Sequence, residues 1–236
     1  MVILDKIKFL KKSKASPNII KNFLFNKFFN VLIKNSIIKN KRNHQLALQN
    51  KKITNDYFSA HAYNFYYYLS KLKSNFNYLE IGSYEGNSAI FIANKFIDSK
   101  ISCVDNWTST EEYIDHISFQ DIEENFNFNI KDYTNIKKIK KSSDDFFKHN
   151  KEMFDVIYID GHHLGSQVFK DCTNAWQKLN NNGYLICDDY IWKFYPDFME
   201  NPCYAINKFL ENIKGFFNVE KVSNSQIFIK KISDKS

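Results

Sequence analysis

The chain has 236 residues, of which 44% are hydrophobic and 25% charged. That is enough for one α/β domain with a full core plus an appendage. Its formal charge of +7 is uneven, because residues 1–52 carry a net +12 and the remainder a net −5. A main body that is mildly acidic does not support binding of nucleic acid.

No apolar run is long enough to span a bilayer, and no signal-peptide cleavage pattern is present. The four cysteines form no C-x-x-C pair, and two of them, Cys103 and Cys187, fall inside predicted strands. Such cysteines are typical of small core residues in a reducing compartment. We therefore expect a cytoplasmic protein.

Residues 1–52 form a basic leading segment, distinct from a main domain at 53–236. Residues 1–16 are rich in lysine and are expected to be loose, whereas Pro17 and Asn18 can start a helix that runs to about residue 39. A wide apolar arc on this helix favours packing on the domain or on a second subunit. The alternative is contact of residues 18–39 with an anionic membrane surface. Residues 40–52 are expected to be a polar connector.

From residue 56 onward, strand and helix patterns alternate. A helix is predicted at 56–72, and later helices near 86–97, 115–128, 143–150, 164–180 and 203–213. Strands are predicted near 77–82, 100–105, 135–140, 154–160, 183–188, 216–222 and 226–232. The last two are joined by three residues and must be antiparallel. The pattern predicts an α/β fold, a doubly wound sheet with a reversed last strand.

Polar and glycine residues follow the first two main-domain strands. The segment Tyr78–Gly86 reads YLEIGSYEG, so that Glu80, Gly82 and Gly86 surround a strand–loop–helix turn. Asp105 ends the next strand, where an acid commonly binds ribose hydroxyls. Tyr84 replaces the middle glycine of a dinucleotide fingerprint, so a pyrophosphate would be crowded. Ordinary polarity at a strand end is the alternative interpretation of Glu80 and Asp105.

Carboxylates also end two later strands. Asp160 ends one, and Asp188 and Asp189 end the next. Clustered carboxylates repel unless a cation lies among them, and an all-oxygen site suits Mg²⁺. The alternative is that some of these acids cap helices or pair with lysines. His163 follows Asp160 by three residues and can act as a general base, with His162 as a rival.

These segments together resemble the class I S-adenosylmethionine-dependent methyltransferases. The resemblance covers roughly residues 55–231 and is to the branch of macrolide-sugar O-methyltransferases and cephalosporin hydroxylase-like proteins. It rests on LEIGSYEG at 79–86, VDNW at 104–107, FDVIYIDGHH at 154–163 and LICDDY at 185–190. The chain departs from the family pattern at His162, at Asn182-Gly183 and in the loop 140–143.

The resemblance implies a Rossmann-like, seven-stranded sheet with an antiparallel last strand, preceded by N-terminal helices. It implies S-adenosylmethionine as cofactor and Mg²⁺ as metal, with a small hydroxylated molecule or sugar as acceptor. It also implies catalysis by His163 and Asp160, and pairing of subunits through the leading helices into a homo-oligomer. A hydroxylase-like or N-methylating enzyme, and a noncatalytic binding or membrane-associated protein, are the alternatives.

The residues assigned by the resemblance fall into two groups. The cofactor is expected at Glu80, Gly82, Ser83, Gly86, Asp105, Ser142, Ser143 and Asp160. The metal is expected at Asp160, Asp188 and Asp189.

Overall fold

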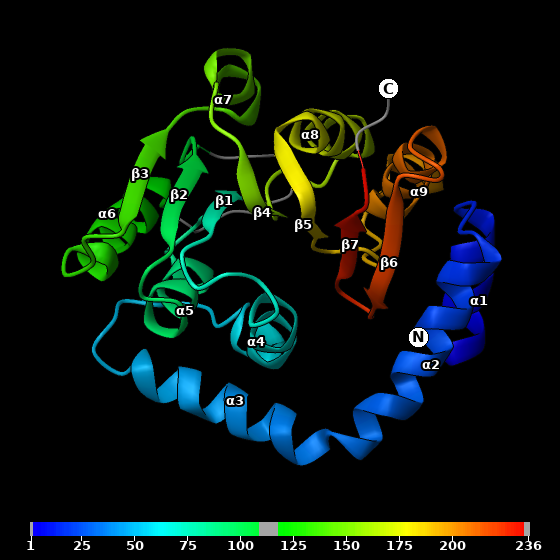
Figure 1. Ribbon diagram of the computed structural model, residues 1–236, viewed down its shortest axis with the longest axis horizontal. Helices are drawn as coiled ribbons and strands as arrows, with labels where there is room; N and C mark the ends of the chain where they lie inside the picture. Colours follow the sequence, from blue (N-terminus) through cyan, green and yellow to red (C-terminus); the bar gives the residue numbers. More distant parts are fainter. Residues whose placement is uncertain (1, 109–117, 234–236) are drawn as a thin grey trace. The chain divides into compact units, whose positions relative to one another are not determined.

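The computed structural model describes residues 2–108 and 118–233 and contains a seven-stranded sheet (Figure 1). Its strand order is β3-β2-β1-β4-β5-β7-β6. The strands are β1 Asn77–Ile81, β2 Lys100–Asp105, β3 Ile136–Lys140, β4 Phe154–Ile159, β5 Leu179–Cys187, β6 Phe217–Val222 and β7 Ile227–Lys231. The expected α/β fold with an antiparallel last strand is confirmed.

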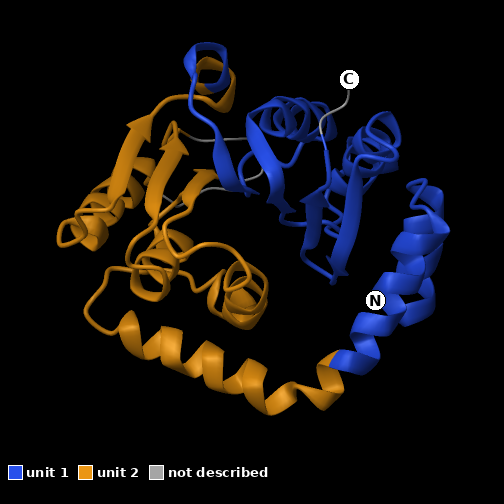
Figure 2. Ribbon diagram, viewed as in Figure 1, with its two compact units in different colours: residues 1–29, 147–236 blue, residues 30–146 orange. Residues whose placement is uncertain are grey.

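The chain divides into two compact units, shown in Figure 2. Unit 2 comprises residues 30–146, and unit 1 comprises residues 1–29 and 147–236. The leading segment therefore contributes to both units.

Unit 2 holds the parallel strands β1, β2 and β3. Its helices are α3 Lys34–Ala47, α4 Ala62–Leu69, α5 Asn87–Lys95 and α6 Phe119–Ile130. The helix expected at 56–72 is shorter, because Asp56 accepts a hydrogen bond from the Ser59 N–H and so precedes a 3-10 turn at Ser59–His61. The expected start of α6 at 115–117 lies outside the described residues.

Unit 1 holds β4 and β5, which are parallel, and the antiparallel pairs β5–β7 and β6–β7. Helices α8 Gly165–Lys178 and α9 Pro202–Asn212 pack on one another, and a 3-10 turn at Phe198–Glu200 precedes α9. Helix α7 Ser143–His149 spans the boundary between the units. Strand β5 begins at Leu179 and not at 183 as expected, and it includes Asn182 with a left-handed φ of 66°.

The leading segment is more helical than expected. Residues Ile3–Lys12 form α1 where a loose segment was predicted, and Leu10 is fully buried. The helix predicted to 39 is interrupted at Ile33, giving α2 Pro17–Leu32 and then α3, which extends to Ala47 through the predicted connector. These three expectations were wrong. In α1, burial of Phe9 and Leu10 outweighs the weak local helix signal.

Helix α2 is attached to the edge of the sheet in unit 1. The Asn22 amide donates to the Val219 carbonyl, and its oxygen accepts from the Val222 N–H at 2.9 Å. These bonds satisfy backbone groups of the edge strand β6, which would otherwise be open to pairing with another chain. Among the described residues, no helix is both long and apolar enough to cross a bilayer.

Candidate active site

The turn from β1 into α5 has a backbone conformation that residues other than glycine rarely adopt. Gly82 and Gly86 have φ of 85° and 83°, and Tyr84 between them is also left-handed at 47°. At Gly86 a Cβ atom would lie 3.1 Å from the Phe126 ring, so glycine is required by both conformation and space. Gly86 precedes the first residue of α5, where free N–H groups suit a polar ligand.

Asp105, at the end of β2, holds this turn. Its carboxylate accepts hydrogen bonds from the backbone N–H groups of Ser83, at 2.9 Å, and Tyr84, at 3.0 Å. A third bond comes from the N–H of Trp107 at 2.8 Å. Burial raises the pKa of Asp105, and these three donors oppose that rise. Asp105 therefore fixes the turn through the same carboxylate that was expected to bind ribose.

Glu80 lies beneath the turn and is fully buried. It accepts hydrogen bonds from the hydroxyls of Tyr78, at 2.8 Å, and Ser88, at 2.7 Å. Burial raises the pKa of Glu80 to about 7, despite these donors. Its carboxyl thus links β1 to α5.

Glu85 is a buried residue of the turn that the motif analysis missed. Its carboxylate is buried and accepts from the Thr54 N–H at 2.7 Å, the Thr54 hydroxyl at 2.8 Å and the Asn125 amide at 2.8 Å. The Asn129 amide donates to the carbonyls of both Glu85 and Lys52. Residues 52–54 are thereby tied to the turn. The sequence signal that could have identified Glu85 was an acidic residue placed between two turn residues, Tyr84 and Gly86.

The two serines expected near adenine lie at the start of α7. The Ser142 hydroxyl accepts from the Asp145 N–H at 3.2 Å, which is an N-terminal helix cap. Ser143 is the first residue of the helix and is half-buried. The cap bond explains why serine suits position 142.

In unit 1, three predicted side chains form a cluster at the ends of β4 and β5. The ligand atoms of Asp160, His163 and Asp189 all lie within 4.8 Å of one another. His163 Nε2 is 3.0 Å from Asp189 Oδ2 and 3.9 Å from Asp160 Oδ1. Because β4 and β5 are parallel neighbours, with Ile159 beside Cys187, the residues that follow them meet at one edge.

Asp188 lies beside this cluster but faces other partners. Its carboxylate accepts from the Gln226 amide at 2.8 Å and, through the same oxygen, from the Tyr158 hydroxyl. The Tyr158 hydroxyl also lies 2.9 Å from Asp160 Oδ2. A single hydroxyl proton cannot serve two carboxylates at once. Tyr158 and Gln226 were missed by sequence reasoning, although Tyr158 lies two strand positions before Asp160 and so shares its face.

The electrostatics of the cluster are unfavourable to full ionisation. Burial, followed by the charges of Asp188 and Asp189, raises the pKa of Asp160 well above its ordinary range, and His163 opposes the rise. Asp189 has a left-handed φ of 50°, and its backbone carbonyl accepts a hydrogen bond from the Trp192 N–H at 2.9 Å. Non-glycine residues in this conformation gather at functional sites.

The Trp192 ring lies 5.0 Å from the His163 ring, centroid to centroid. The two ring planes are tilted by 56°, and the Asp189 carboxylate lies beside Nε2 at 3.0 Å. The arrangement can hold a proton or a divalent cation.

Comparison with known proteins places residues 79–190 in a family model described as a methyltransferase domain. Among curated proteins, the uncharacterized protein R132 of Acanthamoeba polyphaga mimivirus is 27% identical over 154 residues. That match covers 61% of this chain and 63% of R132, which is less than two thirds of the relative's length.

Solved structures share the fold at low sequence identity. A putative caffeoyl-CoA O-methyltransferase from Staphylococcus aureus matches with a TM-score of 0.56 and 15% identity, over 88% of this chain and 99% of that one. The O-methyltransferase TomG from Streptomyces achromogenes, in complex with S-adenosylmethionine, matches at 0.55 and 13% identity, over 90% and 98%. At these identities the likeness is one of fold.

Proposed function

We propose that this chain is a class I S-adenosylmethionine-dependent methyltransferase that methylates a hydroxyl oxygen on a small molecule or sugar. The match of residues 79–190 to a methyltransferase domain and the likeness of fold support the proposal. The observation that carries the proposal is the pairing of His163 Nε2 with Asp189 Oδ2 at 3.0 Å, beside Asp160. A hydroxyl, unlike an amine, must lose its proton as it attacks a methyl group, so an oriented base is needed.

The cofactor is proposed to bind at the turn between β1 and α5 in unit 2. Gly82, Ser83 and Gly86 supply the close backbone approach, and Asp105 holds that backbone in place while offering carboxylate oxygens to a ribose. The TomG structure contains S-adenosylmethionine, which supports the same cofactor here. The sulfonium is already activated, so these residues need only bind and orient it.

His163 is the proposed base. A carboxylate beside one imidazole nitrogen orients the ring and stabilises its charged form, so the other nitrogen takes the proton. Asp189 provides that carboxylate, and Trp192 packs on the ring and limits access of water. Asp160 adds negative charge 3.9 Å from the same nitrogen. In this role His163 would take the proton of the acceptor hydroxyl, and the bound cofactor would supply the methyl group.

The cluster also fits a divalent cation, which we propose is Mg²⁺. Asp160 and Asp189 would hold it, because their oxygens and His163 Nε2 lie within 4.8 Å of one another. Asp188 would be an outer neighbour, since its carboxylate is bonded to Tyr158 and Gln226. Such an ion lowers the pKa of a bound hydroxyl. The carboxylate pair suits Mg²⁺ or Mn²⁺, whereas the imidazole would favour a softer metal.

Release of S-adenosylhomocysteine in a screen of hydroxylated and amine acceptors tests the proposal. Wild type should turn over hydroxylated acceptors, and EDTA should reduce the rate. Turnover of amines alone would move the protein to the N-methylating alternative. Cofactor binding without turnover of any acceptor would favour a noncatalytic relative.

The four cysteines are free and buried, which supports the expected cytoplasmic location.

A further inference from the structure

Helix α2 has apolar side chains on two opposite faces. On one face Ile19 and Phe23 are buried in unit 1. On the other, four large apolar side chains are 63–83% exposed: Phe25, Phe28, Val31 and Leu32. A helix with apolar side chains on two faces normally has both of these faces covered. Exposed apolar residues gathered at helical spacing, as here, mark an interaction surface.

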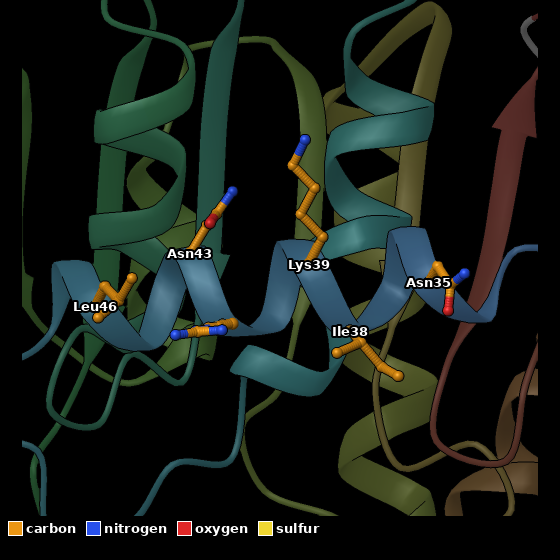
Figure 3. A pocket seen from close by; sticks show the side chains of 6 residues that line it. Asn35, Ile38, Lys39, Asn43 and Leu46 are labelled. Atoms are coloured by element: carbon orange, nitrogen blue, oxygen red, sulfur yellow. The ribbon is translucent and has the colours of Figure 1, made fainter.

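The neighbouring helices expose the same chemistry. At the start of α1, Val2 and Leu4 are more than two thirds exposed. On α3, the half-exposed Ile38 and Leu46 and the cation Lys39 project from the helix, as Figure 3 shows, and together with Arg42 they line a shallow groove. The groove also includes two amide side chains, which can donate to a phosphate oxygen. Each leading helix therefore presents apolar side chains beside cations.

Charge decides between the possible occupants of this surface. Residues 1–52 carry a net +12, and Lys21 and Lys34 are exposed at either end of the α2 patch. In a symmetric contact with a second copy through the same patch, two strongly basic segments would face each other and repel. On an anionic lipid surface, the apolar side chains can instead be buried at the acyl chains, and the negative headgroups attract the lysines.

We propose that the leading helices dock on the surface of a bilayer that contains anionic phospholipids. Phe25, Phe28, Val31 and Leu32 lie at the boundary of the acyl chains, and the lysines reach the phosphate headgroups. The proposal is independent of the methyl acceptor and of the metal.

Flotation of the full-length protein with vesicles tests this docking. Wild type should float with vesicles of phosphatidylcholine and phosphatidylglycerol, and not with phosphatidylcholine alone. Raising the salt concentration should release it, since exposed charges are screened. The double variant Phe28→Ser/Leu32→Ser should bind these vesicles at least about tenfold more weakly than wild type. The matched control is Ile97→Ser, which removes an apolar side chain that is 75% exposed elsewhere and should float as wild type does.

The second-copy alternative is measured in the same samples by light scattering. A wild-type dimer that Phe28→Ser/Leu32→Ser converts to monomer, without flotation, would overturn the lipid proposal in favour of self-association. A wild-type monomer that does not float also contradicts it. Thermal melting and S-adenosylmethionine binding should be the same for the double variant and wild type, which excludes misfolding as the cause of lost flotation.

Discussion

The two units hold their clusters of carboxylates in opposite ways. In unit 2, the carboxylates of Asp105 and Glu85 each accept several N–H or O–H donors from the chain itself. In unit 1, Asp160 and Asp188 compete for one Tyr158 hydroxyl, and Asp189 adds a third charge. The first arrangement fixes a backbone, whereas the second leaves charge that a proton or cation must balance. Rigid binding and reactive chemistry are thus assigned to different strand ends.

The largest expected effect is on the reactive end. Replacing His163→Asn should lower the turnover number by roughly 10²–10⁴-fold, because the acceptor proton loses its base. S-adenosylmethionine affinity should stay unchanged in calorimetry. His162→Asn is the matched control and should keep most of its activity. Equal losses in both variants would remove the special role of His163.

Measurements of metal binding distinguish the two roles that His163 can have, as a general base or as a metal ligand. Asp160→Asn should weaken Mn²⁺ binding by about 10–100-fold or more, and Asp188→Asn by less, since Asp188 is bonded to Tyr158 and Gln226. Because the pKa of Asp160 is raised, wild-type affinity should rise with pH as that carboxyl loses its proton. Calorimetry in buffers of different ionisation enthalpy measures the released proton. Unaltered Mn²⁺ affinity in His163→Asn would support a base over a ligand.

Glu80 tests how a buried carboxyl in unit 2 contributes to the free energy of unfolding at different pH values. Its pKa of about 7 in the folded chain exceeds the unfolded value of 4.5, so the folded state holds the proton more tightly. This stabilising contribution is complete below pH 4.5 and is lost as pH rises to about 7. Relative to Glu80→Gln, wild type should lose about 3 kcal/mol of unfolding free energy between pH 4 and 8. Urea titrations at several pH values measure it, and curves that stay parallel would contradict the burial of a protonated Glu80. The exposed Glu124→Gln should follow wild type.

Glu85 tests whether the turn is held in place for the cofactor. Glu85→Gln puts an amide N–H against a donor, and should weaken S-adenosylmethionine binding by about 1–3 kcal/mol. Thr54→Ala removes the hydroxyl donor to the same carboxylate and should act in the same direction, by less. Calorimetry supplies both values. If neither variant changes the affinity while both fold, the network supports stability alone.

Much of the fold followed from the sequence because strand ends carry strong signals. Gly82, Gly86 and Asp105 marked the turn, and the acids at 160, 188 and 189 marked two neighbouring strand ends. The N-terminal helices were harder to predict. Residues 3–12 carry four lysines in ten positions, and only burial of Phe9 and Leu10 in the folded chain shows why they are helical.

Side-chain partners could not be predicted, because they depend on contacts between distant parts of the chain. Thr54 meets Glu85 across 31 positions, and Gln226 meets Asp188 across 38. Spacing predicted that Asp188 would join Asp160 and Asp189, but it does not show that Tyr158 and Gln226 take its carboxylate. The pattern therefore identified the acids and left their separate roles open.

The most direct test of the central claim is transfer of a trideuteromethyl group from labelled S-adenosylmethionine to a panel of hydroxylated acceptors, followed by mass spectrometry. The account predicts label on an acceptor oxygen with wild type and with His162→Asn, and its near loss with His163→Asn. Label on nitrogen, or equal transfer by the two histidine variants, would contradict it.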